Sequence, residues 1–363
     1  AMTLFRGLAD DLPLMTWLQD HIFPAEAGLD ADQVYWGALL ACAEMIRSGT
    51  TCFCDMYLFT QAVAKAVEAA GLRAVVGEVL FDFPSPNYGP IEQGFAYTED
   101  LVRTWRDNPL ISIAVEPHSP YLCAPELLTR AAALAEEQGL CLVIHLSETQ
   151  SEVAQIEAKT GHTPVGHLAD LGVLGPNLIA PHCVVLTDTD RQLLARHGVK
   201  VAHNPHSNMK LASGVAPVPE LLAAGVCVGL GTDGCASNNN LDMFAEMDVT
   251  AKLHKVQSLD PTVMDAATTL KLATGNGASA LGLNEAIGSL SVGKRADIII
   301  IDSAQPHLTP MYNPVSHLVY AAGGHDVTTT IVNGRVLMAD RRLTTLDEIE
   351  VMARVNEFAR RIR

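Results

Sequence analysis

The chain has 363 residues, 48% of them hydrophobic and 18% charged, which is the composition of a large globular protein. Its 24 Lys and Arg residues against 41 Asp and Glu residues give a formal net charge of −17, so we expect no nucleic-acid partner. No run reaches the roughly 18 apolar residues that a membrane-spanning helix needs. The eight cysteines lack the spacing of a disulfide scaffold, which predicts free thiols and a cytoplasmic protein.

Short β-branched runs alternate with amphipathic helical stretches over the first 233 residues, which is the pattern of βα units in a parallel sheet. We expect seven strands, at residues 50–56, 73–80, 111–117, 140–146, 177–183, 200–203 and 226–232. Helices are expected between them, at residues 32–47, 61–71, 125–139, 188–197 and 217–225. Several of these helices end at a glycine, the residue that most readily adopts the left-handed conformation found there.

Seven βα units are one fewer than an eight-stranded (β/α)8 TIM barrel contains. The helix expected at 32–47 has no strand before it, whereas each later helix has one. A parallel barrel that lacks one strand leaves unpaired edges, which are unfavourable. The pattern therefore predicts an α/β protein with a (β/α)8 barrel whose first strand lies upstream of Ala1 and is missing from this sequence.

The character of the chain changes after Asp233. A helical region to about residue 281 is followed by strand-like runs at 296–301, 327–332 and 335–338, and then by a helix at 346–360. Asn333-Gly334 between the last two strands predicts a two-residue hairpin turn. We expect two domains, a barrel over 1–284 and a small β-sandwich module with a C-terminal helix over 285–363.

Four of the expected strands end in or are followed by a His or Asp residue, namely His118, His145, His182 and Asp233. In a (β/α)8 barrel the active site lies at the C-terminal ends of the strands. One polar residue there is ordinary capping, but four that converge at one mouth indicate a site. Imidazoles with a carboxylate are the ligands of hydrolytic Zn²⁺ or Fe²⁺ sites, and Glu148 follows His145 closely enough to exchange protons with a substrate. This set suggests metal-assisted hydrolysis at a carbon atom.

The residues around these strand ends resemble the motifs of the amidohydrolase superfamily, and more narrowly those of its 5′-methylthioadenosine/S-adenosylhomocysteine deaminase branch. The matching stretches are residues 145–149, 181–183, 231–239 and 293–297. Residues 6–14 and 23–26 resemble the opening of that branch, so the resemblance covers nearly the whole chain. It implies a homo-oligomeric hydrolase of C–N bonds in cyclic amidines that converts an adenosine-type nucleoside into the inosine analogue and ammonia.

Carried over by position, the resemblance implies one divalent metal per chain, with Zn²⁺ as the first choice and Fe²⁺ as the alternative. His145 and Asp233 would be ligands, and Asp233 would also accept the proton of the nucleophilic water. Glu148 would protonate the purine ring and then the departing ammonia, and His182 would stabilise charge at the carbon under attack. The superfamily binds its metal with a further His-x-His pair at the end of the first strand, and this pair is expected upstream of Ala1.

The resemblance also implies five substrate-binding residues. Glu26 would grip the ribose hydroxyls, and His118 and Trp17 would line the nucleoside pocket. Ser237 and Asn238, in the loop after the last expected barrel strand, would touch the substrate from the mouth.

The loop at 81–90 bears on the choice among related nucleosides. It contains no Arg or Lys that could bind the carboxylate of S-adenosylhomocysteine, and its aromatic and proline residues suit an apolar tail. Arg103 and Arg106 follow on an expected helix, where solvated charges are the usual finding. We therefore favour 5′-methylthioadenosine over S-adenosylhomocysteine and adenosine.

Two other functions stay open. The first keeps the site but changes the substrate, as in a guanine-type deaminase or an aminotriazine chlorohydrolase. Glu26 argues for a ribose-bearing substrate, since a free base gives this carboxylate nothing to hold. The second is a non-catalytic binding protein on the same fold, which the absent His-x-His pair motivates.

Overall fold

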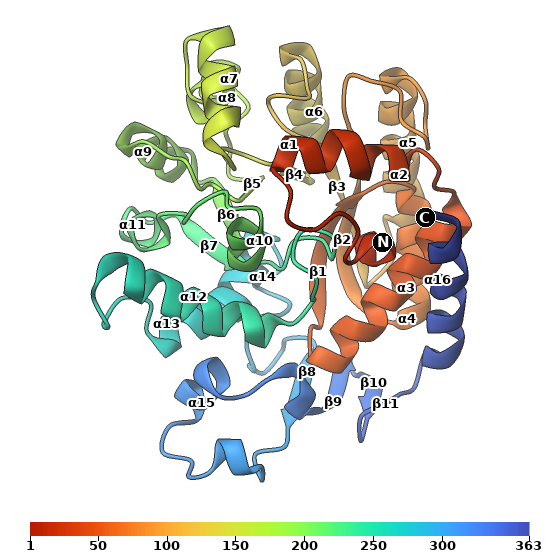
Figure 1. The fold of residues 1–363 in the computed structure, drawn as a ribbon, viewed down its shortest axis with the longest axis vertical. Helices are drawn as coiled ribbons and strands as arrows, with labels where there is room; N and C mark the ends of the chain where they lie inside the picture. Colours follow the sequence, from red (N-terminus) through yellow and green to blue (C-terminus); the bar gives the residue numbers. More distant parts are fainter. Residues whose placement is uncertain (363) are drawn as a thin grey trace.

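A parallel seven-stranded sheet forms the centre of the molecule (Figure 1), in a computed structural model that describes residues 1–362. The strands pair in chain order, each parallel to the next. They are β1 (Cys52–Tyr57), β2 (Arg73–Leu80), β3 (Ile111–Pro117), β4 (Cys141–Val143), β5 (Leu178–Pro181), β6 (Lys200–His203) and β7 (Cys227–Leu230). All seven expected strands are confirmed, and the sheet curls into a partial barrel with helices outside it.

The helices that cover the sheet begin and end close to the expected positions. They are α3 (Ala31–Ser48), α4 (Thr60–Ala70), α5 (Ile91–Trp105), α6 (Pro125–Gln138), α7 (Gln150–Thr160), α8 (Pro164–Asp170), α9 (Asp188–His197), α10 (Pro205–Lys210), α11 (Val218–Ala223), α12 (Met243–Ser258), α13 (Ala266–Lys271) and α14 (Gly277–Ala280), with a π turn, η3 (Leu272–Asn276), between the last two. Asp30 caps α3 by accepting a hydrogen bond from the Gln33 N–H, and the Gln33 side chain accepts from the Asp30 N–H. No helix in the part of the chain described here is long and apolar enough to cross a membrane.

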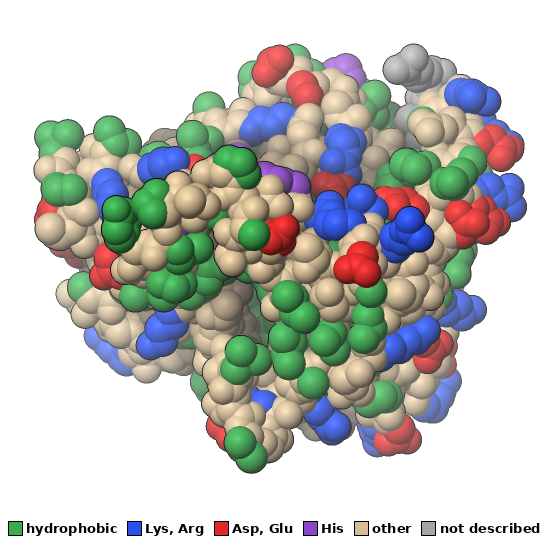
Figure 2. Space-filling model, turned by 90° about the horizontal axis from the view of Figure 1, so that it is seen from below, with side chains coloured by type: hydrophobic (Ala, Val, Ile, Leu, Met, Phe, Trp, Pro, Cys, Tyr) green, Lys and Arg blue, Asp and Glu red, His purple; other side chains and the backbone are tan. Residues whose placement is uncertain are grey.

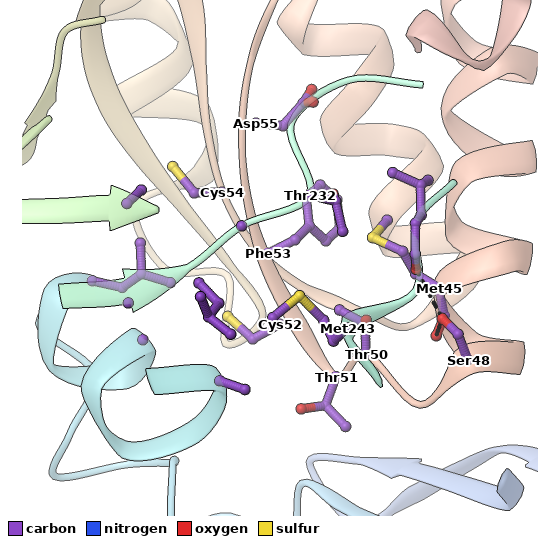
Figure 3. Close-up of a pocket in the computed structure, with 18 of the residues that line it drawn as sticks. Met45, Ser48, Thr50, Thr51, Cys52, Phe53, Cys54, Asp55, Thr232 and Met243 are labelled. Atoms are coloured by element: carbon purple, nitrogen blue, oxygen red, sulfur yellow. Dashed lines mark hydrogen bonds between the residues drawn. The ribbon is translucent and has the colours of Figure 1, made fainter. Parts of the chain in front are cut away.

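The interior of the curled sheet is packed in a layer, as barrel interiors are. Val75, Ala114, Val143 and Ile179, from four successive strands, form a buried cluster there. A cavity of about 650 Å³ lies beside this layer, between β1 and β7, which do not pair with each other over residues 1–362. Figure 3 shows side chains of β1, of α3 and of the loop after β7 around this space.

The N-terminal residues lie across the C-terminal end of the sheet. This segment contains η1 (Met2–Phe5), α1 (Leu14–Trp17), the π turn η2 (Leu18–Ile22) and α2 (Phe23–Glu26). Figure 1 shows α1 and α2, in red, running over the upper ends of the strands. The segment therefore covers the strand ends that carry the predicted site.

A small antiparallel sheet lies at the other end of the barrel, beside the N-terminal ends of the strands (Figure 1). Its strands, in the order β11-β10-β9-β8, are β8 (Ile298–Ile301), β9 (Val327–Val332), β10 (Arg335–Ala339) and β11 (Arg342–Leu343). The predicted hairpin at Asn333-Gly334 is confirmed, because both residues have positive φ, 50° and 81°. The remaining elements are α15 (Pro314–Tyr320), α16 (Glu348–Ile362) and the short turns η4 (Pro306–Leu308) and η5 (Gly324–Asp326).

The expected β-sandwich is not formed by the residues described. They supply one sheet of four strands, and this sheet packs on helix ends instead of on a second sheet. Gly71, at the end of α4 with φ 82°, lies so close to the sheet that a Cβ would sit 2.8 Å from Leu337. Thr330 of β9 donates a hydrogen bond to the Ile46 carbonyl of α3. Helix α3 therefore packs against one face of the small sheet.

One buried ion pair joins the barrel to the small sheet. The Arg73 guanidinium, at the start of β2, donates to both oxygens of Asp297 at 2.9 and 3.1 Å. Both side chains are almost inaccessible to solvent. Figure 2 views the molecule from this end and shows hydrophobic side chains near the middle of the face, with charged side chains around them. The edge strand β8 of the small sheet carries one large exposed hydrophobic side chain, Ile300.

Candidate active site

The structure brings the predicted strand-end residues together at the C-terminal edge of the sheet. His118 follows β3, His145 follows β4, His182 follows β5 and Asp233 follows β7. The ring centroids of His118 and His145 are 4.8 Å apart, and those of His145 and His182 are 5.6 Å apart. His145 and Asp233 both line the upper end of the cavity between β1 and β7. Parallel pairing explains this convergence, because it places all the carboxyl ends at one edge.

His145 is held in the form that binds metals. Its Nδ1–H donates to the carbonyl oxygen of His118 at 2.8 Å, which leaves Nε2 as the nitrogen available for a ligand. Burial and the neighbouring His182 lower the pKa of His145. The imidazole is therefore neutral near pH 7 and can donate its lone pair.

Asp233 is fixed by hydrogen bonds from three directions. Its Oδ2 accepts from the hydroxyls of Ser207 at 2.6 Å and Ser237 at 2.8 Å, and its Oδ1 accepts from the Gly234 N–H at 2.8 Å. Burial alone would raise the pKa of Asp233, but His182, the Ser207 hydroxyl and His145 together lower it below its ordinary value. The carboxylate is therefore ionised and anchored.

His182 lies between two acidic groups. Its Nδ1–H donates to the side-chain oxygen of Asn208 at 2.9 Å, and its Nε2 lies 3.7 Å from the Glu148 carboxylate. Burial lowers the pKa of His182, but the carboxylates of Glu148 and Asp233 outweigh burial and raise the pKa above its ordinary value. This imidazole therefore tends to carry a positive charge inside the site.

Glu152 is a site residue that the sequence analysis missed. Its carboxylate accepts hydrogen bonds from the backbone N–H groups of Ser147, at 3.0 Å, and Glu148, at 2.7 Å. Burial raises the pKa of Glu152 to about 7, although both N–H groups oppose this. Thr149, which caps α7, and Glu152 have the spacing of a capping box, and that signal could have drawn attention to the residue. In the structure the Glu152 side chain reaches past the cap and holds the loop that carries Glu148.

Several residues at the strand ends have a left-handed backbone although they are not glycine. Ser147 has φ 51°, His182 φ 73°, Cys183 φ 47° and Asp233 φ 59°. Such conformations are strained for residues with a Cβ and are often found at functional sites. They turn the chain away from the sheet within four residues of the ends of β4, β5 and β7.

Three of the five predicted substrate residues, Trp17, Glu26 and His118, lie at the ends of α1, α2 and β3. Trp17, at the end of α1, is buried, and Glu26, at the end of α2, lies close to the Tyr57 hydroxyl at the end of β1. Burial raises the pKa of Glu26 to about 7. His118 lies against His145, with its Nδ1 3.0 Å from the Ser119 hydroxyl.

Ser237 and Asn238 are both engaged inside the protein. The Ser237 hydroxyl donates to Asp233, and the Asn238 amide donates to the Thr232 carbonyl at 2.7 Å and to Glu246 at 2.6 Å. Both side chains are buried. The structure thus places them behind Asp233, where they hold its loop.

Lys210 is a second residue that the sequence analysis missed. Its ammonium group donates to Asp10 at 2.7 Å, to the Ala236 carbonyl at 2.8 Å and to the Asn239 side chain. It thereby ties the N-terminal segment to the loop after Asp233. No spacing in the sequence links positions 10, 210 and 236, so only the fold shows this contact.

The donor groups fit a divalent metal. A neutral imidazole and an ionised carboxylate, each oriented by hydrogen bonds to its other atoms, form half of a four-ligand set of the kind that hydrolytic metals take. Residues 1–362 bring two of the predicted ligands to this place, His145 and Asp233. Glu148 and His182 lie beside them.

A sequence profile of the amidohydrolase family matches residues 1–337. The chain therefore belongs to the amidohydrolase family, as the strand-end motifs predicted.

Individual relatives agree with this placement. The chain is 62% identical over 363 residues to the 5-methylthioadenosine/S-adenosylhomocysteine deaminase of Syntrophobacter fumaroxidans, covering 100% of this chain and 83% of the relative. It is 51% identical over 357 residues to the 5′-deoxyadenosine deaminase of Methanothermobacter thermautotrophicus, covering 97% and 82% of the two chains. Among solved structures, an adenosine deaminase from Xanthomonas campestris with bound zinc is similar at a TM-score of 0.98 and 43% identity, covering 100% and 83%.

Proposed function

We propose that this chain catalyses the hydrolytic deamination of an adenosine-type nucleoside, with 5′-methylthioadenosine as the first candidate substrate. The observation that carries the proposal is the convergence of His145, Asp233, His182 and Glu148 at one edge of the sheet. The names of the similar proteins support it, since they describe deaminases of 5-methylthioadenosine, S-adenosylhomocysteine, 5′-deoxyadenosine and adenosine.

His145 and Asp233 would hold the divalent metal, and we propose zinc, because a similar solved structure contains it. When bound, such a metal supplies a Lewis acid that lowers the pKa of water and orients it. A His-x-His pair outside these 363 residues would complete the ligand set.

Two carboxyl groups of the chain, those of Asp233 and Glu148, carry out the proton transfers. Asp233, ionised and anchored, accepts the proton of the attacking water. Glu148, when protonated, gives its proton to the purine ring nitrogen. It then takes the proton of the hydroxyl group formed at the carbon and passes it to the amino group, which leaves as ammonia when the C–N bond breaks. The proton held by Asp233 finally returns to Glu148. His182, which tends to carry a positive charge, stabilises the negative charge on the oxygen that attacks the carbon.

A cluster of three phenylalanine rings in the protein favours a substrate with an apolar 5′ tail. The rings of Phe81 and Phe83 stack with centroids 4.0 Å apart, and Phe23 lies 6.0 Å from Phe83. Phe23 and Glu26 are the two ends of α2, so a ribose held by Glu26 would place its 5′ substituent near these rings. Arg103 is highly exposed and is paired with Asp100, and residues 81–90 contain no Arg or Lys. A methylthio group suits these aromatic surroundings better than the charged tail of S-adenosylhomocysteine.

For the fold, we propose that an eighth strand lies between β1 and β7 and closes a (β/α)8 barrel. The cavity of about 650 Å³ between these strands and the incomplete burial of β1 support it, since β2 is buried over its whole length. We also propose a barrel domain over 1–284, a small module over 285–363, assembly into a homo-oligomer, and a cytoplasmic location in keeping with eight unpaired cysteines.

The test is a deaminase assay on the metal-loaded protein with 5′-methylthioadenosine, S-adenosylhomocysteine, adenosine, guanine and an aminotriazine. We expect the inosine-type spectrum with the first substrate. Glu148→Gln should lower kcat about 10³-fold with metal content unchanged, whereas Glu157→Gln, on the exposed side of α7, should match the wild type. Turnover of guanine or the triazine alone would favour those reactions, and a metal-loaded protein that binds nucleosides without turnover would favour a binding protein.

A further inference from the structure

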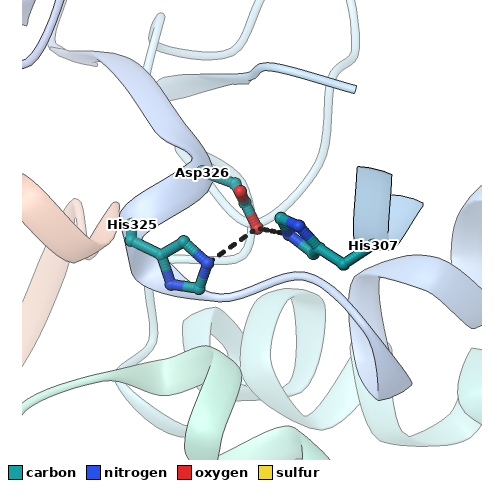
Figure 4. A group of neighbouring side chains, drawn as sticks. All are labelled: His307, His325 and Asp326. Atoms are coloured by element: carbon teal, nitrogen blue, oxygen red, sulfur yellow. Dashed lines mark hydrogen bonds and ion pairs between the residues drawn. The ribbon is translucent and has the colours of Figure 1, made fainter. Parts of the chain in front are cut away.

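A second cluster of metal-ligating side chains lies far from the strand ends. His307 lies in η4, and His325 and Asp326 lie in η5, immediately before β9. Figure 4 shows both imidazoles directed at the carboxylate of Asp326. His307 Nε2 is 3.0 Å and His325 Nε2 is 3.6 Å from the same oxygen, Oδ2. Among residues 1–362 this is the one group of three potential ligands whose donor atoms all lie within 4.8 Å of one another.

The spacing matches what one cation requires. Zinc binds His nitrogen and Asp oxygen at about 2.0–2.1 Å, so two ligands of a tetrahedral ion lie about 3.3–3.4 Å apart. The two N–O distances, 3.0 and 3.6 Å, lie on either side of this value. Shifts of a few tenths of an ångström would therefore bring each nitrogen to the distance from the Asp326 oxygen that a shared ion requires, and the two nitrogens lie within 4.8 Å of each other.

The carboxylate is built into the fold. The Asp326 side chain is almost fully buried, and its Oδ2 also accepts a hydrogen bond from the Gly323 N–H at 2.9 Å. A fixed and buried carboxylate is the anchor that a cation site needs.

A glycine allows His325 to take its position. The imidazole folds back over Gly323, where a Cβ would lie 2.5 Å from the ring. Any other residue at 323 would push the ring away from Asp326. The two imidazoles keep 41% and 72% of their side-chain surface exposed, so a cation can enter from solvent and keep water as further ligands. Asp242, which accepts from the Gly324 N–H at 3.1 Å, adds a further negative charge nearby.

We propose that His307, His325 and Asp326 form a second divalent-metal site, for a cation that prefers imidazole ligands such as Zn²⁺. The site lies at the small-sheet end, opposite the active site, and has no part in deamination. His307 belongs to the connection from β8 to α15, whereas Asp326 ends η5 and immediately precedes β9. A bound ion would therefore fasten this connection to the sheet and stabilise the folded protein.

The chain offers a matched control. His162 Nε2 lies 3.0 Å from Asp170, and both side chains are at least half exposed. This pair reproduces the His–Asp contact without the third ligand or the buried carboxylate. Ordinary surface affinity for zinc should therefore affect both places alike.

The experiment uses the full chain, free of any affinity tag and with its active-site metal in place, equilibrated with Zn²⁺ and then freed of excess metal. We expect His325→Ala and His307→Ala each to contain about one zinc per chain less than the wild type, and His162→Ala to contain the same amount. Excess Zn²⁺ should raise the Tm of the wild type and of His162→Ala, but not of His325→Ala. Deaminase activity of all the variants should stay unchanged.

His325 is largely exposed, so its replacement should not prevent folding, and a circular dichroism spectrum checks this. Equal zinc content in the wild type and His325→Ala would overturn the proposal. A similar loss in His162→Ala would overturn it too, because the zinc would then be bound by surface imidazoles in general. A loss of deaminase activity in step with the zinc would assign the missing ion to the active site.

Discussion

Replacing Glu152 by glutamine tests whether this buried carboxylate positions Glu148. The carboxylate accepts two backbone N–H groups, from Ser147 and Glu148, whereas a glutamine offers one oxygen and turns an NH₂ group toward the other N–H. One charge-assisted hydrogen bond is then lost and one buried N–H is left without an acceptor. Each of these effects is worth about 1–3 kcal/mol, so we expect the free energy of unfolding to fall by about 2–6 kcal/mol.

The effect on catalysis should be larger than the effect on binding. The backbone at Ser147 is strained, and Glu152 is the group that holds the N–H groups of Ser147 and Glu148, so Glu148 should shift by a fraction of an ångström to 1 Å. A misplacement of about 1 Å can cost about 10²-fold in rate, so we expect kcat to fall about 10- to 100-fold with KM nearly unchanged.

The assay follows the conversion of 5′-methylthioadenosine at about pH 8.5, where a carboxyl group whose pKa is about 7 is ionised and accepts both N–H groups. Urea unfolding measures stability, and Glu157→Gln is the control on the same helix. A Glu152→Gln variant that is destabilised as expected but keeps the wild-type kcat would refute the positioning role. An unchanged stability would show instead that the two hydrogen bonds contribute little.

Three further predictions follow from the same structure. Burial raises the pKa of Glu26 to about 7, so the carboxylate that would bind ribose is protonated below this value and ionised above it. We therefore expect 1/KM to rise from about pH 6 to about pH 8, and Glu26→Gln should abolish the rise. Arg73→Ala leaves Asp297 buried without its cation, so urea unfolding should show a loss of about 3–5 kcal/mol, and a loss under about 1 kcal/mol would contradict the structural role of the pair. Ser237→Ala removes a hydrogen bond to Asp233 and should raise the pKa of that carboxyl group. The acidic limb of the pH profile of kcat/KM should then move to higher pH. An acidic limb at the wild-type pH would argue against this contact.

The sequence predicts the fold best where periodicity is strong. The strands at 73–80, 111–117 and 200–203 have the expected bounds. The strand expected at 140–146 ends at Val143, because the chain leaves the sheet to bring His145 against the His118 carbonyl. Hydrophobic pattern alone cannot show this departure, since Ile144 and Leu146 beyond the strand end remain apolar and buried.

The N-terminal segment and the small module were predicted less well, for different reasons. Residues 14–26 form two helices of four residues each around a π turn, which are too short to produce a periodic signal. The sandwich was expected from short strand-like runs, but such runs do not tell whether a sheet faces another sheet or a helix. Here the partner is α3, which is distant in sequence.

For the active site, the sequence predicts which residues end the strands but not what holds them. His118, His145, His182 and Asp233 follow from parallel topology. Their supports come from elsewhere in the chain: Asn208 holds His182, and Ser207 holds Asp233. These contacts join positions 26 residues apart, and no motif predicts them before the fold is known.

The left-handed residues at the strand ends have a consequence for the evolution and engineering of this protein. Each conformation of this kind costs about 1–3 kcal/mol for a residue with a Cβ, so Ser147, His182, Cys183 and Asp233 together store strain at the mouth of the barrel. Ser147→Gly or Cys183→Gly would release part of that strain but would also give the loops more conformational freedom. Selection for heat resistance alone would therefore favour changes at the positions on which turnover depends. Thermostable descendants of this chain that remain active should owe their gains to other regions, such as the helix surfaces and the contact between barrel and small sheet.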